Sequence, residues 1–519
     1  MPNYLTPGVY VEEIPSQSKP IEGVGTSIAA FVGLTPGGPF NTPMRISNWT
    51  QFARIFSDPA DPDAGPFMPS AFLAHAMYGF FHNGGSLAWV VRVGRDAEAK
   101  QAEAVLPSGS EPELGAFKAV AVEGAAQPVR IEVTEETPTP APDGGGGGDA
   151  PTYRIVVTAG HDSEEHSGLS LKKGRNYVAT KVNAASKLIR IEEADAATPE
   201  QRAPKAGTYE LSVTTGPGEL LTAADVAGDE ARRTGLGSLV AVDEITMLCV
   251  PDLVNMTQNG DDTLLRDLQG KMIAHCENAG ERMAILDPPR DLLPQDVLEW
   301  RMNSAGYNSK FATLYYPWIE VVDPLTQRPL LIPPCGHMAG IWSRTDATRG
   351  VHKAPANEVI LGANGLGFQV TGPEQGELNR VGINCIRAFP GRGILVWGAR
   401  TLSNDPEWRY INVRRLFNFI SESIMLGTQW AVFEPNDQRL WISLKISATN
   451  FLTRIWRSGA LFGATPDQAF YVKCDSETNP PDLVEAGQVT VEIGIAPVKP
   501  AEFVVFRLTQ LQLEAGEAA

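Results

Sequence analysis

The sequence predicts an α/β (α+β) core that is interrupted by a β-rich inserted domain and extended at both ends by strand-exchange arms. Three observations predict this fold. Apolar strand-like segments alternate with helix-like segments on both sides of residues 95–235. Residues 95–235 themselves hold short β-like segments between polar loops. Each end of the chain carries an alternating segment that has no obvious local partner.

Residues 1–25 are predicted to form an extended N-terminal arm. They contain four prolines around one alternating segment, residues 8–14, in which Val9 and Val11 face away from Tyr10. An isolated terminal strand is stable only when the edge of another sheet accepts it. We therefore expect this segment to pair with another sheet, and a frayed terminus is the alternative.

Residues 26–94 are predicted to form the first part of the core domain. Residues 26–33 have the composition of a buried strand and end in a Gly/Pro turn. Residues 70–83 place apolar side chains three and four positions apart, which predicts a helix, and residues 86–93 are a further strand.

Residues 95–235 are predicted to form a β-rich inserted domain on the outer surface. Short β-like segments at 129–133 and 153–157 alternate with polar loops. Residues 137–151 contain four prolines and the glycine run 144–148, a composition typical of a flexible loop.

Residues 236–375 are predicted to form the second part of the α/β core. Strands and helices alternate here, which favours a mainly parallel sheet covered by helices. The predicted strands are residues 244–251, 283–287 and 311–316, and the predicted helices are residues 262–279 and 293–305.

Residues 376–490 are predicted to be the C-terminal part of the core. Paired strands are expected at 381–387 and 393–399, separated by a glycine turn. A long helix is expected at 412–428.

Residues 491–519 are predicted to be a C-terminal strand and arm. Residues 488–495 alternate cleanly, and prolines separate them from a second strand at 502–508. We expect this last strand, with Val504, Val505 and Phe506, to leave the domain.

Composition limits the classes of function. The 519 residues carry a formal net charge of -18, which repels nucleic acid and anionic membrane surfaces, so no nucleic-acid contact is expected. Five scattered cysteines without a CxxC pair predict neither a disulfide framework nor a zinc site. No signal peptide and no membrane-spanning segment is recognised, so synthesis in the cytoplasm without stable membrane insertion is expected.

No catalytic, cofactor-binding or metal-binding residue is assigned. The pair Gly270–Lys271 lacks both the first glycine and the hydroxyl of a P-loop. Cys335 and His337 follow two prolines and are interpreted as a turn, because a metal needs three or four converging ligands.

Two alternative functions stay open on the residues alone. An α/β hydrolase would use Asp287, His337 and Asp346 in a cleft, and only the α/β alternation motivates it. A surface adhesin would bind through the inserted domain.

Basic residues concentrate in the C-terminal third of this acidic chain. They form either a solvated face or a strip that docks on an acidic partner. They are Arg409, Arg414, Arg415, Arg439, Arg454 and Arg457.

Several ordered motifs resemble the contractile tail sheath proteins of phages and extracellular injection systems. The resemblance covers nearly the whole chain except the insertion. Its motifs are YLTPGVYVEE at residues 4–13, APAN at 354–357, WGARTL at 397–402, YINVRR at 410–415, FEPN at 433–436 and GALFG at 459–463.

The resemblance implies a mechanical role and no enzyme. Subunits of this family stack in six-fold rings around an inner tube, assemble on a baseplate, end at a terminator or cap, and contract without a cofactor. It implies a component of a phage tail or injection particle that assembles in the bacterial cytoplasm. Inter-subunit strand exchange is expected at Val9, Tyr10 and Val11 and at Val504, Val505 and Phe506. The helix at 450–457 is expected to face the tube through Arg454 and Arg457.

Overall fold

A computed structural model gives the fold of the chain. It describes residues 20–506 except 60, 62–64, 70, 95–102, 111–113, 123–128, 137–150, 160–161, 195–197, 199–200, 212–220, 258–260 and 325. The chain divides into two compact units. Unit 1 comprises Met1–Gly94 and Leu221–Ala519, and unit 2 comprises Arg95–Leu220.

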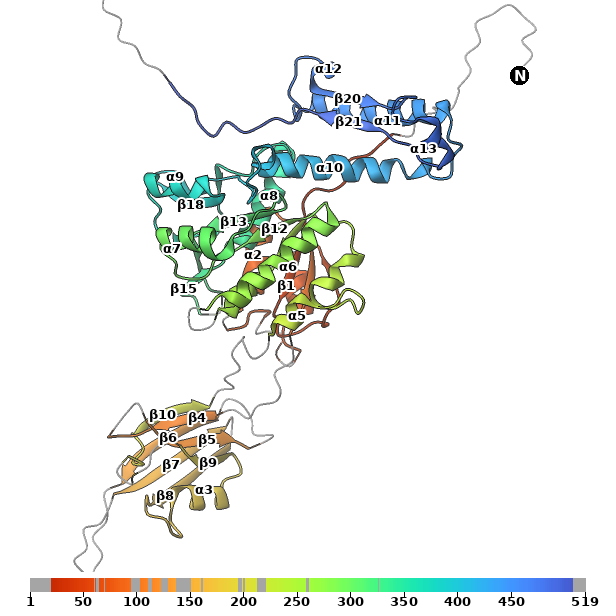
Figure 1. The fold of residues 1–519 in the computed structure, drawn as a ribbon. Coiled ribbons are helices and arrows are strands. Elements are labelled where there is room, and N and C mark those ends of the chain that lie inside the picture. The colour runs from red at the N-terminus through yellow and green to blue at the C-terminus, as the bar shows by residue number, and fades with distance from the viewer. Residues whose placement is uncertain are drawn as a thin grey trace, which may run out of the picture. The chain divides into compact units, whose positions relative to one another are not determined.

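Unit 1 is built on a mainly parallel sheet, as the sequence predicts (Figure 1). Among the described residues it has nine strands in the order β16-β19-β18-β13-β12-β11-β1-β3-β2. Neighbours from β3 to β18 are parallel, and β2, β19 and β16 pair antiparallel at the two sides. The bounds are β1 Ile28–Gly33, β2 Met44–Ile46, β3 Leu87–Arg92, β11 Met247–Cys249, β12 Met283–Leu286, β13 Ala312–Tyr316, β16 Glu358–Val359, β18 Ile383–Phe389 and β19 Gly393–Val396.

Helices pack on this sheet and bury its central strands completely. All four residues of β12 and all five of β13 are buried, as expected for parallel strands covered on both faces. The helical elements are α1 Trp49–Phe56, α2 Leu73–His82, α5 Ala223–Ala227, η2 Gly235–Ala241, η3 Pro251–Met256, α6 Thr263–Ala279, α7 Pro294–Glu299, η4 Trp300–Ala305, α8 Cys335–Arg349 and α9 Gly372–Arg380.

Two helix predictions need correction. The predicted helix at 293–305 stops being regular at Trp300, where a π-type turn, η4, follows α7. The predicted turn at Cys335 and His337 is the first turn of α8. Helix α8 is buried around nearly its whole circumference, so it lacks the polar face that marks a helix in a sequence.

Buried aspartates fill the carboxyl ends of two central strands. Asp252 accepts hydrogen bonds from the backbone N–H groups of Leu34 and Phe72, at 2.7 and 2.5 Å. Asp287 accepts one from the N–H of Cys335 at 3.0 Å. These carboxylates tie the strand ends to the starts of α2 and α8, where a ligand of an α/β sheet would otherwise sit.

The C-terminal part of unit 1 forms a separate layer. Figure 1 shows α10 between the large sheet and the elements α11, β20 and β21. Buried side chains of α10, α11 and β20 form one apolar cluster that also includes Ile21. The bounds are α10 Ile411–Gly427, α11 Gln438–Arg457, α12 Pro466–Ala469, β20 Phe470–Lys473, α13 Pro481–Glu485 and β21 Glu492–Ile495.

The two C-terminal strand predictions have different outcomes. The strand expected at 488–495 is present but shorter, as β21. The second strand, at 502–508, is expected to leave the domain and pair with another copy, so its pairing stays a prediction; within one chain the described residues 502–506 have no regular structure. An extended segment becomes a strand only when a sheet edge pairs with it, and no such edge within the described chain lies against these residues.

A small additional sheet completes unit 1. Its strands β14 Ile319–Val322, β15 Pro329–Ile332 and β17 Gly365–Leu366 pair antiparallel.

Unit 2 is β-rich and has a core of its own. Its two sheets have the orders β4-β5-β9 and β10-β6-β7-β8, and their buried side chains form one cluster with those of α3. The unit ends at Leu220 and not at 235, because α5 and the residues after it pack with unit 1. The bounds are β4 Glu103–Pro107, β5 Gly115–Ala121, β6 Val129–Glu136, β7 Thr152–Ala159, β8 Asp162–Leu169, α3 Val178–Ala185, β9 Ile189–Glu193 and β10 Gly207–Leu211.

Candidate assembly surfaces

The N-terminal segment is fixed to unit 1 from Ile21 onward. The Ile21 side chain is fully buried against Gly427, where an added Cβ would lie 2.7 Å from it. The Arg454 guanidinium donates to the Ile21 carbonyl, and the Val24 N–H donates to the Ser423 hydroxyl at 3.1 Å. Val9, Tyr10 and Val11 lie outside the described residues. The predicted arm, residues 1–25, is too long at its end, because residues from Ile21 onward pack on unit 1.

A buried ion pair holds the same N-terminal segment at Thr26. Arg415 donates to both carboxylate oxygens of Asp346, at 2.9 and 2.5 Å, and to the carbonyl of Thr26 at 2.9 Å. The Thr26 hydroxyl donates to Asp346 at 2.7 Å. The first core strand is therefore tied to both α8 and α10.

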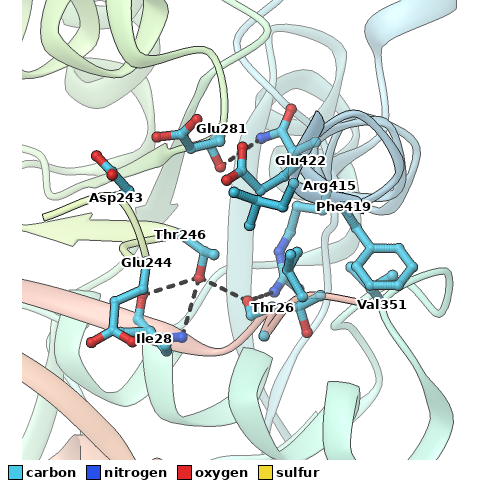
Figure 2. A pocket seen from close by; sticks show the side chains of 14 residues that line it. Thr26, Ile28, Asp243, Glu244, Thr246, Glu281, Val351, Arg415, Phe419 and Glu422 are labelled. Carbon is cyan, nitrogen blue, oxygen red and sulfur yellow. Dashed lines mark hydrogen bonds between the residues drawn. The ribbon is translucent and has the colours of Figure 1, made fainter. Parts of the chain in front are cut away.

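A cavity of about 220 Å³ lies beside this ion pair (Figure 2). Figure 2 shows Glu281 and Glu422 pointing toward each other across it, with Asp243 nearby. Burial, followed by the charge of Glu422, raises the pKa of Glu281 to about 7. The cavity is therefore lined by a carboxyl group, Glu281, whose pKa is raised by burial and by the nearby charge of Glu422.

The neighbouring arginines neutralise little of the negative charge of this carboxyl pair. The Arg282 guanidinium donates to the carbonyls of Leu239 and Val242, at 3.0 and 2.5 Å, and its Nε lies 3.9 Å from a Glu281 oxygen. Arg415 is committed to Asp346.

The C-terminal segment leaves unit 1 as an exposed apolar strip. Within the described residues, which end at 506, its last side chain with an ion pair is Glu502, which contacts Arg400. The next four side chains are 77, 70, 78 and 84% exposed, and they are Phe503, Val504, Val505 and Phe506. We call residues 503–506 the exit strip. Four consecutive large apolar side chains in water are typical of a surface that a partner covers.

The sheet of β20 and β21 has open edges. Phe470 pairs with Ile495, and Lys473 pairs with Glu492. Each strand has one neighbour among the described residues, so each also has one unpaired edge. A two-stranded sheet is marginal alone and gains stability from further strands.

The outer face of α11 is cationic. The helix contains no acidic residue, and its exposed positions carry four basic side chains and two isoleucines. Arg454 and Arg457 are both on this face, although Arg454 also holds Ile21. The other members are Arg439, Ile442, Lys445 and Ile446. The sequence analysis missed the isoleucines and Lys445, which recur at three- and four-residue spacings along the helix.

Two of the arginines singled out from the sequence are structural. Arg414 lies 4.5 Å from the Trp408 ring centroid, and burial lowers its pKa to about 10. Arg415 forms the buried pair with Asp346. Neither belongs to an exposed basic strip.

The residues of the hydrolase alternative do not converge. Asp287 contacts the first turn of α8, which contains His337, but Asp346 lies nine positions further, about 13 Å along the helix axis. Asp346 is committed to Arg415 and Thr26. No group of metal-ligating side chains was found among the described residues, and none of their helices is long and apolar enough to cross a membrane.

Comparison with known proteins identifies relatives of the chain. Residues 235–402 match the phage tail sheath protein central domain, and residues 403–510 match the phage tail sheath C-terminal domain. The tail sheath protein of Burkholderia phage BcepMu is 24% identical over 525 residues, which cover 96% of this chain and 95% of that protein.

Another relative, the tail sheath protein of Salmonella phage ViI, is 26% identical over 250 residues. That alignment covers 44% of this chain and 38% of the phage protein. The match to the Vibrio phage KVP40 tail sheath protein covers 29% of that protein, so the chain spans well under half of these two relatives.

Solved structures share the fold over almost the whole chain. A chain of the anti-feeding prophage baseplate has a TM-score of 0.58 and 24% identity, covering 98% of this chain and 100% of that one. A chain of the PVC sheath complex in its contracted state has a TM-score of 0.58 and 22% identity, covering 98% and 99%. The two family models are consecutive and span residues 235–510, more than half of the 519 residues, and the chain therefore belongs to the phage tail sheath family.

Proposed function

We propose that this protein is the structural subunit of a contractile tail sheath, which polymerises helically around an inner tube and contracts to drive the tube through a target envelope. Membership of the family supports the proposal. One observation carries it: the sheet β20–β21 has open edges, while the exit strip is an extended apolar segment without a strand partner in the described chain. The sheet offers a free edge, and the exit strip is an extended segment that could pair with such an edge.

The arms link subunits by adding strands to the β20–β21 sheet of neighbouring copies. Val504, Val505 and Phe506 take one edge, and Val9, Tyr10 and Val11 take the other. Each backbone hydrogen bond contributes roughly 0.5–1.5 kcal/mol net, so four or five bonds give several kcal/mol per arm. Covalently continuous arms keep neighbours joined while their bodies move.

The cationic face of α11 contacts the inner tube. Arg454 and Arg457 lie in its last turn, and Arg439 and Lys445 extend the face toward its start. A partner that fits four cations and two isoleucines is an acidic surface with apolar patches. Such a contact weakens as salt rises, because the charges are exposed.

The further partners follow from this role. Copies of the chain stack in six-fold rings, and the baseplate and a terminator or cap protein close the two ends. Assembly takes place in the bacterial cytoplasm as part of a phage tail or injection particle, and residues 95–220 form an outer domain. The protein does mechanical work without cofactor or catalysis, and neither nucleic acid nor membrane takes part.

Electron microscopy of purified protein tests the proposal. The full chain should form long hollow helical tubes, whereas a variant lacking residues 1–14 should stay as folded monomers. Normal long tubes from the truncated variant would refute the arm mechanism. Discrete particles with hydrolytic turnover from the full chain would favour the enzyme alternative.

A point substitution tests the C-terminal arm. Val505→Asp places a charge in the exit strip and should prevent tube formation. Val322→Asp is the matched control, because Val322 is also an exposed valine of unit 1 but lies on β14. Tubes from both variants would argue against pairing by residues 503–506.

A further inference from the structure

The C-terminal segment is attached to unit 1 at separate points. The Val498 N–H donates to the Ala460 carbonyl at 3.2 Å, and the Asn412 side chain donates to the Val498 carbonyl at 3.1 Å. Residues 498–504 line a groove of about 870 Å³ together with Lys353 and Trp397. The next attachment is Glu502, directly before the exit strip.

The Glu502 carboxylate is held by the side chains of Arg400, Tyr410 and Asn379. Arg400 donates to it from Nε at 2.9 Å and from Nη2 at 2.5 Å, and the Tyr410 hydroxyl lies 3.2 Å away. The Glu502 and Arg400 side chains are only 17 and 11% exposed. Burial alone would raise the pKa of Glu502, but the Arg400 guanidinium lowers it below its usual value. The contact is a charge-assisted, two-pronged pair, which is the strongest kind of side-chain hydrogen bond.

Arg400 is in turn fixed to the large sheet. Its N–H donates to the Asn384 side chain at 2.7 Å, and its carbonyl accepts from that side chain at 2.8 Å and from the Thr313 hydroxyl at 3.1 Å. Asn384 lies on β18 and Thr313 on β13, two neighbouring parallel strands. A force applied to Glu502 therefore reaches β18 and β13, the third and fourth strands of the nine-stranded sheet, through Arg400.

We propose that Arg400 and Tyr410 are positioning residues for strand exchange, because they clamp Glu502 as the fixed point from which the C-terminal arm leaves the subunit. This inference rests on the proposed function. The clamp holds the arm's backbone in place up to residue 502, so the exit strip reaches its acceptor sheet with a set origin and register. The clamp also transmits the pull of a neighbouring subunit to the core sheet at Glu502, before that pull reaches the weaker contacts at Val498.

Polymerisation of the full-length protein tests the clamp. Glu502→Gln removes the charge and keeps the shape, and Tyr410→Phe removes one hydroxyl. Glu502→Gln should raise the protein concentration needed for polymerisation about tenfold or more, and Tyr410→Phe should raise it by a smaller factor. Lys271→Met is the control, because it removes an exposed pair with Asp267 on α6.

Two further measurements separate positioning from folding. The thermal midpoint of the monomer should change little, while hydrogen exchange should accelerate in residues 498–506 alone. If Glu502→Gln strongly lowers the thermal midpoint, the test uses Tyr410→Phe instead. This variant loses only one hydroxyl group, so it should leave the monomer folded while it weakens the clamp.

A deletion of residues 503–519 distinguishes this inference from the proposed function. If the deletion abolishes tubes while Glu502→Gln and Tyr410→Phe polymerise like the full chain, the clamp is overturned and the arm mechanism stands. If the deletion itself leaves normal tubes, C-terminal strand exchange is wrong, and the clamp proposal falls with it.

Discussion

Arg415 on α10 and Asp346 on α8 form a two-pronged ion pair whose side chains are 3 and 4% exposed. Removing one partner of such a pair leaves a buried charge uncompensated, which typically costs about 3–5 kcal/mol. Arg415→Met should therefore lower the free energy of unfolding of unit 1 by about that amount. Chemical denaturation followed by fluorescence measures it.

The control for this prediction is Arg380→Met, which removes an exposed pair and should cost less than about 1 kcal/mol. Equal effects of the two substitutions would contradict a structural role for Arg415.

The carboxyl pair in the cavity predicts a dependence of stability on pH. The pKa of Glu281 is raised from 4.5 to about 7 in the folded protein, so folding favours its protonated form. The stability from this group is fully present below pH 4.5 and is lost as pH rises through about 7. Glu422→Gln removes the repulsion and should stabilise the protein above pH 7 more than at pH 5.

Thermal midpoints measured between pH 4.5 and 8.5 check this expectation. Glu434→Gln, on the exposed connection between α10 and α11, should leave the pH profile unchanged. The same pH profile of the thermal midpoint for the wild type and for Glu422→Gln would contradict repulsion between the two carboxyl groups.

Helices α2 and α8 approach closely at Gly79. An added Cβ at this position would lie 2.2 Å from ring atoms of His337, which is buried. Gly79→Ala should therefore destabilise unit 1 by about 1–3 kcal/mol through overpacking. Gly376→Ala on α9 is the matched control, because nothing lies within 4 Å of its added Cβ and alanine favours the helix. A neutral Gly79→Ala would mean that α8 can shift freely.

The cationic face of α11 predicts a salt-sensitive association with the inner tube protein. Lys445→Glu combined with Arg457→Glu should weaken that association about tenfold at low salt, and the loss should shrink as salt rises. Lys271→Glu on α6 is the control, since Lys271 is exposed but pairs with Asp267. Co-sedimentation with assembled tubes measures the effect, and unchanged binding by the double variant would exclude this face.

Unit 2 should fold without unit 1. Its strands pair only with each other among the described residues, and its buried side chains form a separate cluster. A fragment of residues 95–220 should give β-type circular dichroism and a cooperative thermal transition. A fragment without a transition would show that its core needs unit 1. Binding of the folded fragment to cells or glycans would favour the adhesin alternative.

The strands and helices with clear periodicity were predictable within a few residues. β1, β12, β13, α6 and α10 all lie where their apolar spacing places them. Helix α8 escaped prediction because burial on every side removes the polar stripe that reveals a helix.

The assembly surfaces were predictable in part. The strand-like composition of residues 502–508 located the exposed segment, but a strand needs a partner edge, so its pairing cannot be read from one chain. The clamp was not predictable, since Arg400 and Glu502 are 102 positions apart and only the fold brings them together.

The single helix α10 contacts the two segments from which the arms leave the subunit. Asn412 near its start holds Val498, and Ser423 and Gly427 near its end hold Val24 and Ile21. A helix keeps a fixed rise of 1.5 Å per residue, so these two anchorages stay about 20 Å apart whatever the surrounding bodies do. In a lattice linked through both arms, every subunit would thus keep this distance along α10 constant. Changes in the pitch and diameter of the lattice would have to come from rotations about the two ends of α10.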